Sequence, residues 1–352
     1  MVMLARRRNI RLSNGVEVQT PLLVPSFSSM AMGPIPYAAI GTKPVDTICS
    51  IVHTDALVGS IEEALLLSAY DIHYGFLSAY ESLSKDFQHS PYSQARFLIL
   101  DSGWYEKDGA SPGKLFIENI QETLTWEEAQ YAATLDTLDA NLRANAVSWD
   151  YDGPYAEQIA KAQDFFGGRT RFASTLLLKS PKEARFHHFG QLSGEDVANL
   201  RAFDIVGVTE KELGETILDK LVAIARLRML MDDAGVPAPI HVFGGLDPLS
   251  TPLYVAAGGE IFDGLGWLRY AYMGGSAFNR DAAMLLEQNS DKRWSLATTS
   301  IQLDNLNALA ELRAELQVFI HAKEDWKKFR RGDDLRPVFE LFSAKLEAGH
   351  GR

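Results

Sequence analysis

The stretch Gly259-Glu260-Ile261-Phe262-Asp263-Gly264-Leu265 indicates the fold class, because it has the pattern of a buried strand that ends in a carboxylate. A short apolar run bounded by turn residues is typical of a parallel strand that is covered on both faces. Asp263 stands at the point where such a strand gives way to a loop. Asp263 is therefore the first candidate for a functional side chain, and a candidate nucleophile.

Seven other stretches have the same length and apolar character: Pro21–Phe27, Thr47–His53, Phe97–Ser102, Asn145–Asp150, Phe172–Leu178, Phe203–Thr209 and Ile240–Gly245. Segments with apolar residues at spacings of three and four lie between them: Glu62–Ala69, Trp126–Arg143, Tyr155–Phe166, Pro181–Arg201, Glu210–Asp233 and Pro248–Ala257. Eight strands that alternate with helices predict an α/β fold, a (β/α)8 TIM barrel. An open doubly wound sheet is the alternative, but no G-x-G-x-x-G motif follows the first strand.

Both ends of the chain add elements to the predicted barrel. Residues Ile10–Val18 predict an N-terminal hairpin, because an Asn-Gly pair supplies the positive φ of a tight turn, and this hairpin would be a lid or plug. Only helical patterns follow the barrel, at Leu303–Phe319 and Leu335–Leu346. We expect residues 1–281 to form the barrel and residues 282–352 to form a C-terminal helical extension packed on it.

Composition limits the class of protein. The chain has 352 residues, of which 46% are apolar and 23% charged, as expected of a globular protein. Lys and Arg total 34 against 46 Asp and Glu, and the net charge of −12 argues mildly against nucleic acid while it permits a local basic patch. A single cysteine, Cys49, excludes an internal disulfide and any site with two thiolates from one chain. Because no signal-like or membrane-spanning run is present, we expect a cytoplasmic protein without a membrane partner.

Three of the predicted strands end in an aspartate. Asp101, Asp150 and Asp263 lie at the ends of the third, fourth and eighth runs, and in a barrel the chemistry is found at C-terminal strand ends. Two carboxylates there suit glycosyl transfer, in which one attacks an anomeric carbon and the other shuttles a proton. The plainer alternative is that each aspartate caps the next helix. Three of them on one face favour the functional interpretation.

Residues near these aspartates suggest a pocket for a flat ligand. Gly103 permits a tight turn, and Trp104 and Tyr105 offer aromatic faces for stacking, although both rings could simply fill the barrel mouth. Gly207 and the pair Gly244-Gly245 would let a ligand approach the backbone near the ends of the sixth and seventh strands.

The histidines favour no catalytic arrangement. His53 ends the second predicted strand and could face the site, whereas His187, His188 and His241 lack partners at metal-ligand spacing. A lone histidine is more often structural. No H-E-x-x-H, Walker loop or G-x-S-x-G motif is present, so a serine hydrolase has no support. We expect neither a metal nor a cofactor.

Taken in order, these motifs resemble the tRNA-guanine transglycosylase family, the base-exchange enzymes of queuosine and archaeosine formation, over most of the chain. Asp101-Ser102-Gly103 matches the family's Asp-Ser-Gly motif. Trp149-Asp150 with Pro154 is similar to its Phe-Asp-Glu-x-x-Pro segment, and Phe262-Asp263 with Arg269 approximately matches its Phe-Asp-x-x-x-x-x-Arg segment.

The resemblance implies a role for each matched residue. Asp263 would attack C1′ of the target nucleotide to form a covalent intermediate, and Asp101 would be its acid/base partner. Asp150 would bind the edge of a guanine or 7-deazapurine base, and Tyr105 would stack on that base. The other predicted substrate-binding residues are Ser102, Gly103, Gly207, Gly244, Gly245, Arg269 and Lys179.

The chain departs from the family at the zinc site and in the base pocket. No Cys of the family's Cys-x-Cys-x-x-Cys…His subdomain precedes Leu303-Asp304-Asn305-Leu306, which is otherwise similar to the family's late helix, and Asp304 replaces the His. Ligand count therefore excludes zinc. Lys179 follows the fifth strand where the family has Gln-Gln-Gly, and Thr209-Glu210 replaces a Gly-Gly pair. These changes predict a substrate with different hydrogen-bonding groups.

The sequence thus predicts a transglycosylase-like pentosyltransferase that exchanges a guanine or 7-deazaguanine-type base through a covalent Asp263 intermediate. The substrate would be RNA, including tRNA, or DNA, and a free nucleotide also suits the net charge. The alternative is a catalytically retired barrel that acts as a base- or nucleic-acid-binding or targeting subunit of a homo- or hetero-oligomer. Basic segments Arg6–Arg8 and Lys327–Arg331 could follow phosphates, although a solvated face balanced by acidic neighbours is the simpler interpretation.

Overall fold

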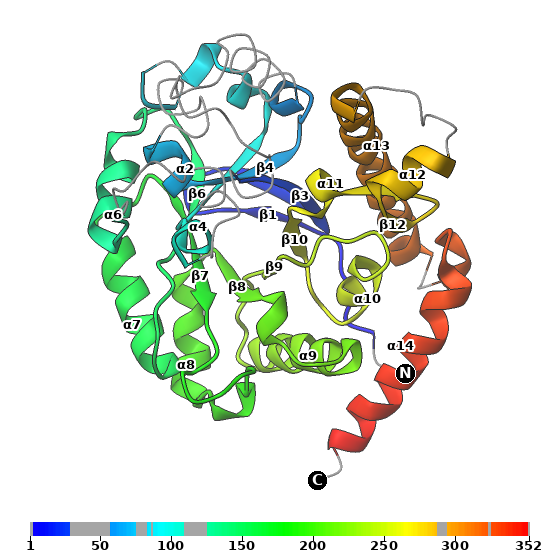
Figure 1. Cartoon of the computed structure of the whole chain (residues 1–352). Coiled ribbons are helices and arrows are strands. Elements are labelled where there is room, and N and C mark those ends of the chain that lie inside the picture. The colour runs from blue at the N-terminus through cyan, green and yellow to red at the C-terminus, as the bar shows by residue number, and fades with distance from the viewer. Residues whose placement is uncertain are drawn as a thin grey trace.

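Eight parallel strands close into a barrel at the centre of the molecule (Figure 1). The computed structural model describes residues 3–28, 57–74, 83–85, 87–108, 125–286, 294–322 and 325–350, and of 294–299 and 349–350 the backbone only. In barrel order the strands are β10 (Ile261–Gly264), β3 (Leu22–Phe27), β4 (Ala64–Ser68), β5 (Phe97–Asp101), β6 (Ala144–Val147), β7 (Ala173–Leu178), β8 (Ile205–Thr209) and β9 (Ile240–Phe243). The predicted α/β fold of the (β/α)8 TIM-barrel type is confirmed.

The second strand of the barrel is not the one that the sequence predicts. β4 lies inside the segment Glu62–Ala69, so the helix predicted there is wrong. Ala and Leu favour helices, but all five residues of β4 are buried, and the strand pairs with β3 on one edge and β5 on the other. Pairing on both edges of a closed sheet overrides the local preference. The predicted strand Thr47–His53 lies outside the described residues.

Helices follow most of the strands, and the longer ones lie around the outside of the barrel (Figure 1). They are α2 (Ala69–His73), α4 (Trp104–Asp108), α6 (Glu128–Thr137), α7 (Tyr155–Phe166), α8 (Gly194–Asn199), α9 (Ile217–Asp233) and α10 (Thr251–Ala256). Short 3-10 turns accompany them at η1 (Phe87–His89), η2 (Pro91–Gln94), η3 (Phe189–Gln191), η4 (Leu200–Ala202) and η5 (Glu210–Glu212). α7 has the predicted bounds, whereas the helix predicted at Pro181–Arg201 is wrong over its first half. α8 begins only after Ser193, whose hydroxyl accepts from the Asp196 N–H and caps the helix.

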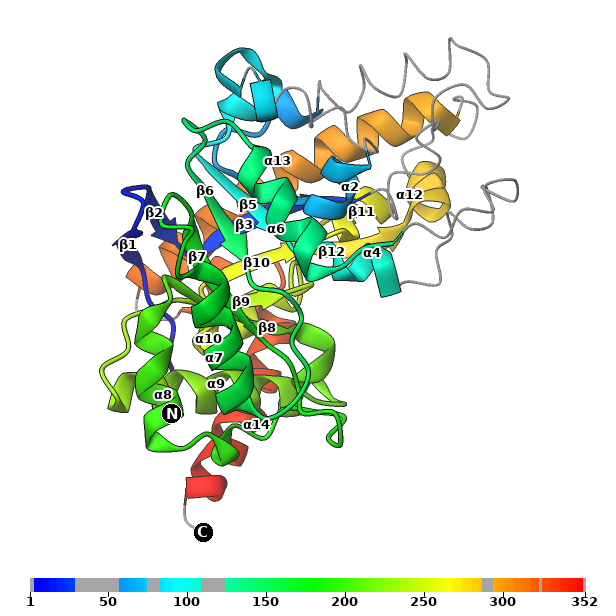
Figure 2. The same ribbon diagram turned by 90° about the vertical axis from the view of Figure 1, so that its left-hand side faces the viewer.

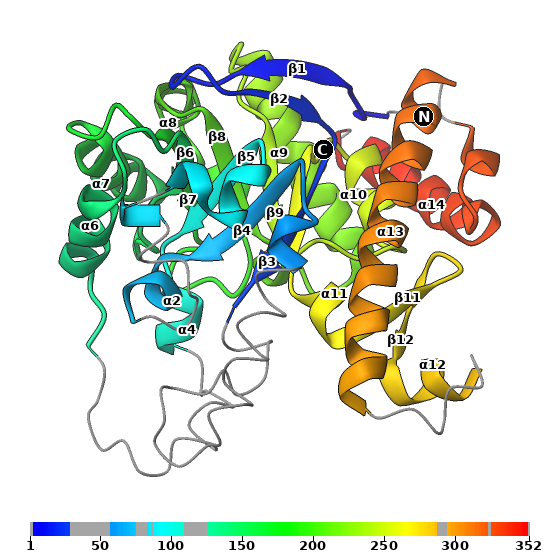
Figure 3. The same cartoon turned by 90° about the horizontal axis from the view of Figure 1, so that it is seen from above.

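The N-terminal hairpin closes one end of the barrel. β1 (Arg8–Arg11) and β2 (Glu17–Thr20) pair antiparallel, as predicted. Leu12 and Val18 of this hairpin pack with apolar residues that begin six of the barrel strands: Leu22, Ala64, Phe97, Ala173, Ile205 and Ile261. The hairpin is therefore a plug at the N-terminal strand ends. Figures 2 and 3 show it on the opposite side of the barrel from α2 and α4, which leaves the C-terminal strand ends for the site.

After the barrel the chain forms a second hairpin, β11 (Tyr270–Met273) and β12 (Ser276–Asn279), and two long helices, α13 (Trp294–His321) and α14 (Gly332–His350). Shorter helical elements accompany them: α11 (Gly266–Arg269), α12 (Arg280–Leu286) and η6 (Trp326–Lys328). The sequence does not predict the β11–β12 hairpin. Asn305 of α13 holds it in place, because its amide donates to the carbonyls of Trp267 and Tyr270 at 2.6 and 2.7 Å. Its side-chain oxygen accepts from the Tyr272 N–H at 2.6 Å.

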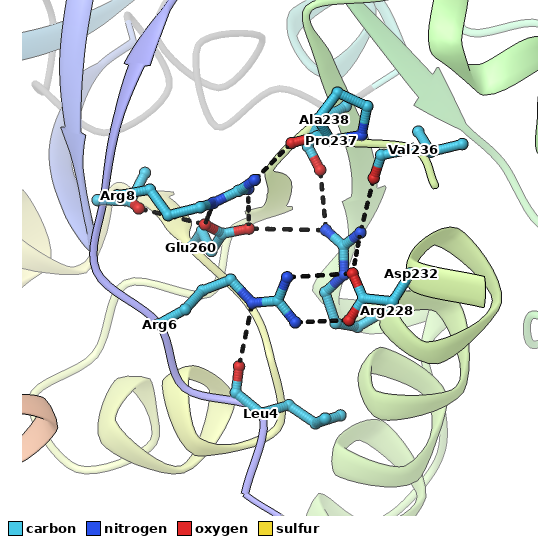
Figure 4. A network of polar contacts seen from close by, with 10 residues as sticks. Leu4, Arg6, Arg8, Arg228, Asp232, Val236, Pro237, Ala238 and Glu260 are labelled. Carbon is cyan, nitrogen blue, oxygen red and sulfur yellow. Dashed lines mark hydrogen bonds and ion pairs between the residues drawn. The ribbon is translucent and has the colours of Figure 1, made fainter. Parts of the chain in front are cut away.

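A network of arginines and carboxylates ties the N-terminal segment to the barrel (Figure 4). Arg8 donates to both oxygens of Glu260 at 2.7 and 2.6 Å, and Arg6 to both oxygens of Asp232 at 3.0 and 2.6 Å. The fully buried Arg228 lies 2.8 Å from Asp232 and 3.7 Å from Glu260. Because Arg6 and Arg8 are held by carboxylates, this segment has a structural role and is poorly placed to follow phosphates.

The second basic segment, 327–331, also has acidic partners. Arg330 lies 2.6 Å from Glu311, and Arg331 lies 2.8 Å from Asp334. All four side chains are largely exposed. These exposed ion pairs agree with the simpler interpretation of this basic segment, a solvated face balanced by acidic neighbours.

Candidate active site

The three aspartates singled out in the sequence lie at the C-terminal end of the barrel. Asp101 is the last residue of β5, Asp263 is the third residue of β10, and Asp150 follows β6 by three residues. Burial raises the pKa of Asp101, and the negative charges of Asp150 and Asp263 are among the further causes that raise it. Asp150 and Asp263 are therefore both close enough to Asp101 to affect its pKa.

Asp263 is an oriented carboxylate. Ser26 Oγ donates to its Oδ2 at 2.7 Å, the Gly244 N–H donates to its Oδ1 at 3.1 Å, and His241 Nε2 lies 3.1 Å from the same Oδ1. The residue is only 7% exposed. Such donors stabilise negative charge on a carboxylate and fix its plane. None of them belongs to the first turn of α11, so these contacts are not those of a helix cap.

Asp101 has the surroundings of a proton donor. The residue is half-buried, but desolvation of its carboxyl group is the largest cause that raises its pKa, which lies well above the ordinary value. The charges of Asp150 and Glu106 raise the pKa further, whereas the Gly103 N–H, which donates to Oδ2 at 3.2 Å, lowers it. A carboxyl group of this kind keeps its proton at higher pH and can pass it to a leaving group.

Asp150 is held from two sides. Ser102 Oγ donates to its Oδ2 at 2.8 Å, and Lys179 Nζ lies 3.3 Å from its Oδ1. Burial raises the pKa of Asp150, although Lys179 and Ser102 oppose that rise. Lys179 also lies 2.7 Å from Glu212 and donates to Thr209 Oγ1 at 3.4 Å, so its ammonium group has three partners within the chain. Lys179 therefore neutralises and orients Asp150.

The turn between Asp101 and α4 depends on glycine. Gly103 has a φ of +80°, and a Cβ atom added there would lie 2.5 Å from the Cβ of Tyr70. Trp126 Nε1 donates to the Ser102 carbonyl at 2.9 Å and fixes the same turn from the other side. Both features keep Asp101 and Ser102 in place at the barrel mouth.

Glu106 is a buried acid that the sequence argument misses. Its carboxyl group accepts from Ser28 Oγ at 2.5 Å and from Ser68 Oγ at 2.8 Å, at the ends of β3 and β4. Burial and the charge of Asp71 raise the pKa of Glu106 to about 8. The closeness of Glu106 to the Asp-Ser-Gly motif, three residues after it, could have pointed to this residue. Its burial, however, depends on the ends of β3 and β4, which are distant in the sequence.

The aromatic residues after the Asp-Ser-Gly motif take different positions. Tyr105 is 43% exposed, and its hydroxyl accepts from Arg269 Nη2 at 3.3 Å, which joins α4 to α11. Trp104 packs edge-on against Trp149 with ring centroids 5.4 Å apart, and Lys107 lies over its ring. Tyr105 is thus the more exposed of the two rings, whereas Trp104 contributes to the packing of the mouth.

The glycines predicted to admit a ligand also differ. At Gly207 an added Cβ would lie 2.5 Å from Phe243, so this glycine makes room for an aromatic ring of the barrel. At Gly245 an added Cβ would lie 2.8 Å from Val242. Gly244 has a φ of +77° with nothing within 4 Å of an added Cβ, and its N–H donates to Asp263. Gly244 is therefore the glycine of this group that belongs directly to the carboxylate site.

Within the described ranges no group of three or more His, Cys, Asp or Glu side chains is arranged to hold a metal ion. None of the helices there combines the length and apolar character needed to cross a membrane. Comparison with models of known protein families and with curated proteins finds no match to this chain.

Proposed function

We propose that this protein is a transglycosylase-like enzyme that exchanges a guanine or 7-deazaguanine-type base at C1′ of a nucleotide in RNA or DNA. The observation that carries the proposal is that Asp263 and Asp101 lie at the C-terminal ends of two barrel strands in contrasting surroundings. Asp263 has three groups that stabilise its negative charge, and Asp101 lies in surroundings that favour its protonated form. The resemblance of the motifs around both residues to the transglycosylase family supports the same assignment.

These two groups suffice for a double displacement. A carboxylate oxygen of Asp263 attacks C1′ while the bond from C1′ to the base nitrogen breaks, and the proton of Asp101 goes to the departing base. The incoming base then gives a proton to the Asp101 carboxylate, and its nitrogen attacks C1′. The ester bond breaks, and Asp263 regains its negative charge. Two inversions leave the sugar configuration unchanged.

The remaining site residues fit the recognition of a flat base. Each oxygen of the Asp150 carboxylate has one of these partners, Ser102 at Oδ2 and Lys179 at Oδ1. Lone pairs therefore remain on both oxygens to accept from donors on a base edge. The exposed ring of Tyr105, held by Arg269, offers a stacking surface. A base inside a duplex or a structured loop would have to leave its stack to reach this site.

The test is incorporation of tritium-labelled guanine into total tRNA, unstructured RNA and duplex DNA, together with trapping of a covalent protein–nucleic acid adduct. We expect label and adduct with one polymer, and neither with Asp263→Asn. Asp152→Asn is the matched control, because Asp152 lies in the same loop as Asp150 but is 62% exposed and pairs with Lys182. Absence of adduct and label with all three polymers would contradict the proposal.

A second candidate function is a catalytically retired barrel that binds a base or a nucleic acid as a targeting subunit. The observation in its favour is that Lys179 neutralises Asp150, where a base edge would otherwise meet a free carboxylate. Calorimetry with guanine and with tRNA distinguishes the two. Binding that is unchanged in Asp263→Asn, without any adduct, would favour the binding subunit.

A further inference from the structure

His241 is a buried side chain that the double displacement does not use. It comes from β9 inside the barrel, is fully buried, and stacks on Phe243 with ring centroids 3.8 Å apart. Its Nε2 lies 3.1 Å from Oδ1 of Asp263, the carboxylate of the adjacent strand β10. The sequence alone does not identify the partner of this histidine, because Asp263 lies 22 residues further along the chain.

The surroundings of the ring determine which nitrogen carries the proton. Nδ1 is buried and has no hydrogen-bond partner among the described residues, whereas Nε2 faces a carboxylate oxygen. A proton on Nδ1 would leave a buried donor unpaired, and a bare Nε2 would place two acceptors against each other. The tautomer with the proton on Nε2 satisfies the contact, so the ring donates to Asp263.

The donors divide unequally between the two oxygens of Asp263. Among the residues that the structure describes, Oδ1 accepts from His241 and from the Gly244 N–H, whereas Oδ2 accepts from the Ser26 hydroxyl alone. Oδ2 therefore keeps more electron density for attack. Once Oδ2 is bonded to C1′, Oδ1 becomes the ester carbonyl oxygen, and negative charge returns to this carboxyl group when the ester breaks. Two fixed N–H donors at Oδ1 are suited to stabilise that charge.

We propose that His241 is a positioning residue, which directs Asp263 to attack through Oδ2 and stabilises Oδ1 as the carbonyl oxygen of the ester intermediate. The kinetic part of this inference rests on the proposed function, whereas the hydrogen bond from His241 to Asp263 does not. His241 is assigned a role through Asp263, because its ring is fully buried and its Nε2 contacts that carboxylate.

The first experiment examines the full chain with isotope-labelled histidine by proton–nitrogen correlation NMR. His241→Gln identifies the signal of His241 among the eight histidines of the chain. We expect a ring protonated at Nε2 whose signal moves in Asp263→Asn and does not move in Asp152→Asn. A ring protonated at Nδ1, or a signal that ignores Asp263→Asn, would overturn the inference.

The second experiment measures guanine exchange with the polymer that accepts label. We expect His241→Leu to lower kcat about 10- to 100-fold with KM within about 3-fold, and His241→Gln, which keeps a donor near Nε2, to recover most of the rate. Ser26→Ala should lower kcat less than His241→Leu does. His188→Gln, at an exposed histidine, is the control. An unchanged kcat in His241→Leu, a failure of Gln to recover more rate than Leu, or a larger loss in Ser26→Ala would overturn the inference.

The two experiments separate this inference from the proposed function. If no polymer accepts label but the NMR signal of His241 responds to Asp263→Asn, the function is wrong and the hydrogen bond stands. If label is incorporated and kcat is indifferent to His241→Leu, the function stands and the positioning role is wrong. Should His241→Leu fail to fold, His241→Gln and the NMR experiment still test whether His241 donates a hydrogen bond to Asp263.

Discussion

Lys179 and Asp150 form an ion pair at 3.3 Å on the face of the barrel where the candidate catalytic carboxyl groups lie. Burial opposes the charge of Lys179, but Asp150 and Glu212 outweigh it and raise the pKa of the lysine. The lysine side chain is 16% exposed and its two carboxylate partners 9% and 14%, so the cluster is largely shielded from water.

Replacement of Lys179 by Met should destabilise the protein. It leaves two poorly hydrated carboxylates close together without a counter-charge, and breaking a buried pair typically costs about 3–5 kcal/mol. We expect a free energy of unfolding lower by about 2–4 kcal/mol, measured by urea titration at neutral pH. Lys182→Met is the control, because its pair with Asp152 is 76% and 62% exposed and should contribute less than about 1 kcal/mol. Equal losses in the two variants would contradict the shielding of the cluster.

Glu106 should make stability depend on pH. Its pKa is raised to about 8 in the folded protein, so between about pH 4.5 and 8 the native state holds a proton that the unfolded state has released. The stability linked to this proton is complete below that window and is lost as pH rises through it. Glu106→Gln should therefore lose less stability than the natural chain between pH 5 and pH 8, as measured by Tm at each pH. Parallel curves for the two proteins would show that Glu106 is ionised in the native state.

Asp101 should set the alkaline limit of activity. Because its pKa is raised by burial and by the charge of Asp150, its acid form persists to higher pH, and the rate should fall as pH rises through that pKa. Asp101→Asn cannot transfer a proton and should slow adduct formation about 100- to 10,000-fold. The measurement is single-turnover adduct formation across pH. A variant that keeps both the rate and the alkaline limit would remove Asp101 from the chemistry.

Glu260 should contribute strongly to stability at the opposite end of the barrel. Its side chain is 1% exposed, accepts from Arg8 at both oxygens, and lies 3.7 Å from the buried Arg228. Glu260→Gln leaves Arg228 and Arg8 without this counter-charge and should lower the free energy of unfolding by about 3 kcal/mol. Glu340→Gln, at a pair 64% and 51% exposed, should change it by less than about 1 kcal/mol. A negligible effect of Glu260→Gln would show that the N-terminal segment is held by other contacts.

Much of the barrel follows from local sequence. Seven of the eight strands lie within or close to the runs that the apolar pattern predicts, because a strand buried on both faces needs a continuous apolar stretch between turn residues. The exception, Ala64–Ser68, has the composition of a helix and becomes a strand only because β3 and β5 offer both edges. No local signal carries that information.

The sequence by itself determined the three aspartates at strand ends, because parallel strands of a barrel bring their C-terminal ends to one face. Only the tertiary structure decided what surrounds each of them. His241 and Ser26 contact Asp263 from the two strands beside β10, at sequence separations of 22 and 237 residues. Glu106 owes its raised pKa to burial and to the charge of Asp71, whereas the hydrogen bonds from Ser28, just after β3, and from Ser68 of β4 lower it. Protonation and hydrogen bonding depend on neighbours in space. The closed sheet makes neighbours of residues that are far apart in the chain.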